Sequence, residues 1–144
     1  MALNRRTIPA TFIAPIVGAT ITMMAYGLIW SVIGPEPSQA PDIFSTLVMT
    51  FWMGALMGAV VGWPVTIILG GATHALLYRA GVRGIFAYIL VGAVIAVSVC
   101  LFLLRSSARF DIFAFSATTG GTIAAIAWLI RRPDRDANPV TPTP

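Results

Sequence analysis

The chain has 144 residues, of which 58% are hydrophobic and only 10% are charged, with a mean hydropathy of +0.88. Soluble domains carry about 25% charged residues, so these few charges could not cover the surface of a soluble globular enzyme. One cysteine excludes a disulfide-stapled secreted module, and the apolar content excludes a disordered chain. The composition therefore predicts a small polytopic membrane protein.

Four uncharged stretches predict four transmembrane helices. About 20 apolar residues cross a hydrocarbon core of roughly 30 Å, and only a helix satisfies its own backbone groups at that depth. The predicted fold is an all-α compact bundle within residues 1–132, with spans 8–33, 43–63, 85–104 and 112–130. The first apolar stretch is too long for a signal-peptide core, which favours an uncleaved anchor.

Pro64 sets the expected shape of the second span. It has no amide hydrogen and clashes with the carbonyl of Val60, so we expect a kink there. Trp63 would lie near the lipid headgroups, and residues 65–79 would continue as a kinked helical extension. The alternative is a helix displaced inwards, with Leu69 still in lipid.

The distribution of the arginines predicts the orientation. Cytoplasmic loops near helix ends are enriched in basic residues. Two of the nine, Arg105 and Arg109, fall in the third loop, and the other seven lie at the termini and in the second loop: Arg5, Arg6, Arg79, Arg83, Arg131, Arg132 and Arg135. This pattern places both termini in the cytoplasm of a bacterial cell with the chain in the inner membrane, and it indicates attraction to anionic lipid instead of nucleic-acid binding. The polar, proline-rich residues 133–144 predict a disordered tail.

The most specific motif is the glycine seam, formed by Gly54, Gly58 and Gly62 on one face of the second span. Two successive G-x-x-x-G steps leave a groove that a neighbouring helix backbone can approach closely. The same spacing of small residues recurs in the first and fourth spans, as Ala10, Ala14, Gly18 and as Ala117, Gly121, Ala125. These faces are either packing surfaces within one bundle or contacts between copies of the chain.

A second candidate feature is the hydroxyl cluster of the fourth span: Ser116, Thr118, Thr119 and Thr122. Hydroxyl groups in lipid bond to the carbonyl one turn back or to another helix. Helix stabilisation is one interpretation of the cluster. The other is a polar path for a small solute, with Gly120 and Gly121 loosening the helix.

The scarcity and the positions of the charged and nucleophilic residues argue against catalysis. A lone histidine, His74, cannot make a zinc site and is expected to form a hydrogen bond near the inner interface. Arg105 and Arg109 of the third loop could form ion pairs with Glu36 and Asp42 of the first loop, as a clasp between the two outer loops. Alternatively, they could bind an acidic partner. All five carboxylates lie outside the spans, which disfavours an ion-coupled carrier. Neither a Ser/His/Asp set nor a metal-ligand or phosphate-binding motif occurs, so we expect no enzyme, cofactor or metal.

The sequence thus predicts an integral inner-membrane protein without intrinsic catalysis. Its expected role is that of an accessory or scaffold subunit that packs with another membrane protein or with itself. The alternative is a passive channel or facilitator for a small solute, formed by an oligomer along Ser116, Thr118, Thr119 and Thr122. Its partners would be the lipid bilayer and a membrane protein, and no nucleic acid.

Overall fold

The computed structural model describes residues 7–33, 42–104 and 110–132, and it is helical apart from the connections. Its elements are α1 (Thr7–Ile33), α2 (Ile43–Met57), η1 (Gly58–Gly62), α3 (Trp63–Val65), η2 (Thr66–Gly70), α4 (Gly71–Arg79), α5 (Ile85–Leu104) and α6 (Phe110–Arg131). The elements from α2 to α4 form one continuous helix, called the α2–α4 helix below. Within these residues, four helices are long and apolar enough to cross a membrane, in agreement with the predicted number. The predicted tail at 133–144 and the proposed clasp of Arg105 and Arg109 lie outside the described residues.

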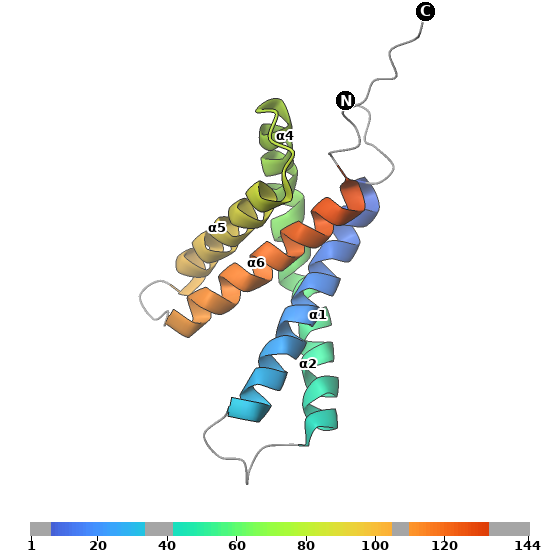
Figure 1. Cartoon of the computed structure of the whole chain (residues 1–144), viewed down its shortest axis with the longest axis vertical. Helices are drawn as coiled ribbons and strands as arrows, with labels where there is room; N and C mark the ends of the chain where they lie inside the picture. Colours follow the sequence, from blue (N-terminus) through green and yellow to red (C-terminus); the bar gives the residue numbers. More distant parts are fainter. Residues whose placement is uncertain (1–6, 34–41, 105–109, 133–144) are drawn as a thin grey trace, which may run out of the picture.

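The helices pack in a row, in the order α2–α4, α1, α6, α5. Figure 1 shows two helical hairpins, one of α1 with the α2–α4 helix and one of α5 with α6, which cross where α1 meets α6. Within the described residues, α5 packs extensively only against α6. The expected compact bundle is thus an open arrangement of packed helices, in which the two outermost helices do not close the ring.

The first helix is the centre of the packing. In the apolar, membrane-spanning stretch of α1 a third of the residues are buried, whereas about a tenth or less are buried in the corresponding stretch of each of the other three helices. Ala10 and Ala14 are buried on it, and the ring of Pro15 is completely enclosed. The ring of Tyr26 meets that of Phe115 on α6 edge to face, with their centroids 4.9 Å apart. Small and rigid side chains on α1 therefore allow neighbours to approach on two sides.

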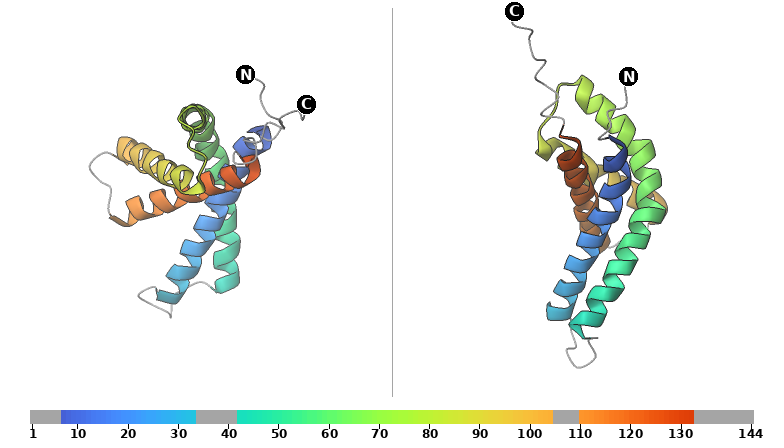
Figure 2. Two further views of the ribbon diagram at one scale, coloured as in Figure 1. Left: turned by 45° about the horizontal axis from the view of Figure 1, so that its top comes forward. Right: turned by 90° about the vertical axis from the view of Figure 1, so that its right-hand side faces the viewer.

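The α2–α4 helix widens on both sides of Pro64. Gly58–Gly62 and Thr66–Gly70 are π-helical, and the amides of Trp63 and Gly71 donate to the carbonyls five residues earlier. Because Pro64 has no amide hydrogen, the regular pattern of bonds cannot pass through it, and wider turns redistribute the bonds around it. Figure 2 shows the helix curving along α1 as it runs from α2 to α4.

A glycine turn ends the α2–α4 helix. Gly81 has a φ of +72°, which favours glycine because a side chain there would be strained. The amide of Gly81 donates to the carbonyl of Tyr78, and that of Val82 donates to the carbonyl of Leu77. These two bonds form a Schellman motif, which stops the helix and turns the chain towards α5.

Asp42 caps the start of α2. One carboxylate oxygen accepts from the amide of Ser45 at 2.9 Å, and the other accepts from the Ser45 hydroxyl at 2.7 Å. Both bonds favour the ionised form, so the amide first and the hydroxyl second lower the pKa of Asp42 below 3.8. The cap therefore contributes stability at neutral pH, and this contribution is lost as the pH falls through the lowered pKa.

We expect Asp42→Ala to lower the thermal midpoint of the detergent-solubilised protein at neutral pH, because the first turn of α2 loses its cap. The difference from wild type should shrink in acid, where the wild-type carboxyl is protonated as well. Asp42→Asn is the matched control, since asparagine also caps helices well. An Asp42→Ala loss that is independent of pH would contradict this role for the carboxylate.

Candidate functional site

The glycine seam faces α1. A Cβ atom on Gly54 would lie 2.6 Å from the Cα of Thr20, and one on Gly58 would lie 2.5 Å from the carbonyl oxygen of Pro15. A Cβ on Gly62 would lie 2.8 Å from the Cβ of Pro15. The seam is therefore occupied within one molecule, where backbone meets backbone, and this geometry corresponds to the first of the two interpretations of the sequence.

A second glycine contact joins α5 to α6, and the sequence analysis missed it. A Cβ on Gly92 would lie 2.6 Å from the carbonyl oxygen of Gly120, and a Cβ on Gly120 would overlap the Gly92 carbonyl and the Ala96 side chain. Gly92 and Ala96 have the small-x-x-x-small spacing that signals close helix approach. That spacing could have predicted the contact, although it consists of one small-x-x-x-small step, whereas the glycine seam of α2 has two.

The four hydroxyl residues of α6 do not share one surface. Ser116 and Thr119 line a large groove, whereas Thr118 and Thr122 are absent from its lining. The three threonine hydroxyls donate to carbonyls one turn back on α6 itself, at 2.7–2.8 Å. Of the two bonding patterns expected for hydroxyl groups in lipid, these threonines thus show bonding within their own helix and not to another helix.

The groove lies between the two hairpins and has a volume of about 950 Å³. Residues from α1, the α2–α4 helix, α5 and α6 line it, because in the described part of the chain the α2–α4 helix and α5 do not pack closely against each other. Along α5 it extends from Tyr88 to Leu103, about 22 Å at the rise of an α-helix. Its walls are almost entirely apolar, and they include Val65, Ile95, Val99 and Ile123.

One end of the groove, called the polar mouth below, is lined by His74, Tyr78, Tyr88, Trp128 and Arg131. The Nδ1 atom of His74 is hydrogen-bonded to the hydroxyl of Tyr88 at 2.9 Å, which joins α4 to α5. This is the hydrogen bond that the sequence analysis expected for His74, with a partner that it did not identify. Arg131, the last residue of α6, lines the same end of the groove.

The turn after α4 brings Arg83 beside the polar mouth. Its guanidinium carbon lies 5.9 Å from the centre of the Tyr78 ring, within cation–π range. The indole nitrogen of Trp128 donates to the Arg83 carbonyl at 2.8 Å, which holds this turn against the end of α6. The Nε atom of Arg83 is buried and has no hydrogen-bond partner among the described residues.

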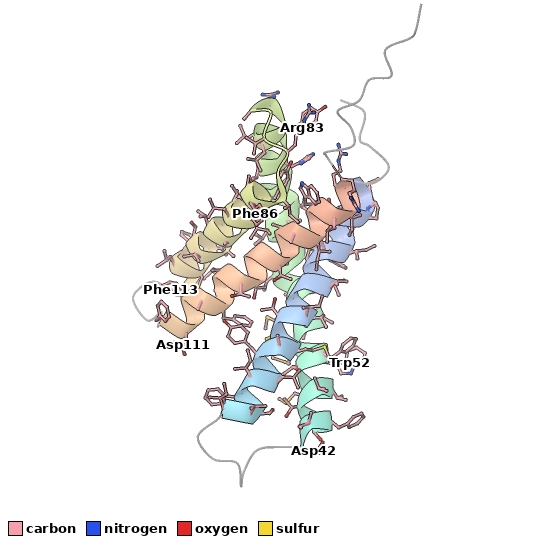
Figure 3. The ribbon with its side chains drawn as sticks, in the orientation of Figure 1. Asp42, Trp52, Arg83, Phe86, Asp111 and Phe113 are labelled. Carbon is pink, nitrogen blue, oxygen red and sulfur yellow. The ribbon has the colours of Figure 1, made fainter. Side chains whose placement is uncertain are left out.

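Among the residues that the structure describes, the arginines and the aspartates lie towards opposite ends of the molecule. Figure 3 shows Arg83 at the end that carries the polar mouth, and Asp42 and Asp111 at the starts of α2 and α6, towards the other end. Arg79 and Arg131 end α4 and α6 at the basic end. Among the described charged residues, the cations thus gather where the groove becomes polar.

The tryptophans have different surroundings. Trp63 donates its indole N–H to the carbonyl of Phe12 at 2.9 Å and meets the Phe12 ring edge to face, so it links α3 to α1. Trp52 is 67% exposed and points away from α1 (Figure 3). Among the described residues, no group of three metal-ligating side chains occurs.

No protein family matches the chain, and neither a curated protein nor a solved structure is similar to it. Four long apolar helices, packed together and exposing large apolar side chains, define a multi-pass membrane protein. At 144 residues it is a small one.

Proposed function

We propose that the protein is an accessory or scaffold subunit without intrinsic catalysis, which packs beside another membrane protein or a second copy of itself. The observation that carries this proposal is the position of α5 at the edge of the row. Among the helices that the structure describes, it packs extensively on α6 alone, and its outward face presents Phe86, Leu90, Val94 and Leu101 at four- or seven-residue spacings. An apolar helix with a single close neighbour offers its remaining surface to a further helix.

The proposed location is the bacterial inner membrane, with the basic end in the cytoplasm. The described arginines lie at the end where α1 begins and α6 ends (Figure 1), which supports a cytoplasmic position for both termini. Asp42 and Asp111 would then lie at the periplasmic side.

A solute path is less favoured by the same observations. The hydroxyls of Thr118, Thr119 and Thr122 bond to their own helix, and the groove beside Ser116 and Thr119 has apolar walls. A path for a polar solute would need exposed hydrogen-bonding groups along its length. Stabilisation of α6 by these hydrogen bonds accounts for the threonines without a solute path.

The accessory role is tested by cross-linking in the native membrane, mild extraction and identification of the co-purifying protein. Leu90→Trp, on the outward face of α5, should lower partner recovery by about tenfold, since a misfit of about 1.4 kcal/mol at a helix contact is sufficient. Met49→Trp on α2 is the matched control, because Leu90 and Met49 are 66% and 68% exposed. It should leave recovery unchanged.

Two outcomes would contradict the accessory role. One is equal recovery with Leu90→Trp and with wild type. The other is solute flux through liposomes that hold only this protein, if Thr119→Val abolishes the flux. The second result would favour the channel, because Thr119 is the threonine of the cluster that lines the groove.

A further inference from the structure

The groove combines a long apolar channel with a polar, cationic mouth. Beyond the mouth it extends along α5 from Gly92 to Leu103, about 16 Å, with mostly apolar walls, and this length is close to the roughly 15 Å that one leaflet contributes to the hydrocarbon core. Only at one end do an imidazole, two phenol hydroxyls, an indole and a guanidinium line it. An occupant complementary to this surface has apolar chains and a polar head at one end.

The charge of the mouth selects the kind of head. Arg131 lines the mouth, Arg83 borders it over the Tyr78 ring, and the described acidic residues lie at the other end of the molecule. Arginine forms strong hydrogen bonds with phosphate oxygens, and basic pockets between transmembrane helices on the cytoplasmic side bind anionic head groups.

We propose that the groove binds an anionic phospholipid of the surrounding bilayer, with its phosphate at Arg131 and Arg83 and its acyl chains along the wall formed by α5 and α6. The His74–Tyr88 hydrogen bond joins α4 to α5 at the mouth, so that the Tyr88 hydroxyl is held in place before the lipid enters. The lipid site is independent of the accessory role, because it uses the groove face of α5 instead of its outward face.

The test measures lipid binding to the full chain, purified in detergent and washed free of lipid. Native mass spectrometry follows titrations with phosphatidylglycerol and phosphatidylcholine that have identical acyl chains. We expect phosphatidylglycerol to bind at least about tenfold more tightly, given that each arginine near the head group contributes about fivefold. Phosphatidylglycerol should also raise the thermal midpoint more than phosphatidylcholine does.

Three variants locate the site. Arg131→Gln and Arg83→Gln should each weaken phosphatidylglycerol binding by about fivefold and leave phosphatidylcholine binding unchanged. Arg79→Gln is the matched control: it removes the same charge at the same end, but Arg79 is exposed and does not line the groove. Gly71→Trp, at a groove position where an added Cβ meets nothing within 4 Å, should fill the groove and weaken both lipids without unfolding the chain.

Equal affinity for the two lipids would overturn the proposal. So would an Arg79→Gln loss as large as that of Arg131→Gln, which would indicate a diffuse charge effect. Displacement of phosphatidylglycerol by inorganic phosphate alone would identify a site for free anions and reject the lipid. Circular dichroism of each variant separates loss of binding from loss of fold, and Gly71→Trp still tests the groove if an arginine variant is unfolded.

Discussion

Replacement of Gly58 by isoleucine is expected to separate the α2–α4 helix from α1 and to unfold the first hairpin. The first added carbon would already lie 2.5 Å from the Pro15 carbonyl oxygen and 2.7 Å from the Cα of Ile16. These are backbone atoms of a helix, so they cannot rotate away as a flexible side chain can. Overpacking a core costs about 1–3 kcal/mol, and a branched side chain against backbone should reach or exceed the upper value.

The measurement is the thermal midpoint in mild detergent, together with the elution volume. Gly58→Ala should show part of the loss, and Gly71→Ala on the same helix should show none, because its Cβ would meet nothing within 4 Å. In a helix, alanine is in fact favoured over glycine by up to about 1 kcal/mol. Should Gly58→Ile keep the midpoint but change the oligomeric state, the glycine seam would act between molecules instead.

Gly120→Ala is expected to detach α5 from α6, although it adds only one methyl group. That group would overlap the carbonyl oxygen of Gly92 and the side chain of Ala96. The cost should again be about 1–3 kcal/mol. Because α5 packs extensively only against α6 within the described residues, the single His74–Tyr88 bond to α4 should not compensate for the loss of this interface.

The adjacent glycine provides the control. A Cβ on Gly121 would lie 3.3 Å from the Cγ2 methyl of Ile89 and 3.6 Å from its carbonyl oxygen, which a shift of a few tenths of an ångström accommodates. Gly121→Ala should therefore keep nearly the wild-type midpoint and the protection of α5 from proteolysis. Equal midpoints for Gly120→Ala and Gly121→Ala would show that the α5–α6 contact is looser than described.

The sequence predicts the helices well because lipid requires them. A long stretch without charges must satisfy its backbone internally, so the spans 8–33, 85–104 and 112–130 agree closely with α1, α5 and α6. The proline at 64 predicts an irregular helix, but two π-helical segments replace the single expected kink. How a freed backbone is satisfied depends on the glycines nearby, and a proline alone does not specify it.

The faces of the helices were harder to predict. In a soluble helix the buried face is apolar and the other is polar, whereas lipid-facing and protein-facing residues are both apolar in a membrane. Three glycines in register made the face of α2 recognisable, but the contact of Gly92 with Gly120 had a weaker pattern. The same loss of contrast explains why the open row could not be distinguished from a closed bundle.

The candidate site depends on which ends of the helices meet. The sequence placed His74 at the inner interface with a hydrogen bond, and the structure supplies Tyr88, fourteen residues later across the Gly81 turn. The four hydroxyl residues of α6 were grouped by proximity in the chain. The helical period separates Ser116 and Thr119, on the groove, from Thr118 and Thr122.

The row of helices has a consequence for the order of assembly. Ribosomal synthesis delivers α1 and the α2–α4 helix first, and their mutual contact needs nothing that follows in the chain. Helix α5 then enters the bilayer before its main neighbour, α6, has been synthesised. Among the described helices only α6 packs extensively against both α1 and α5, so the helix that is synthesised after the other three is the one that joins the two hairpins.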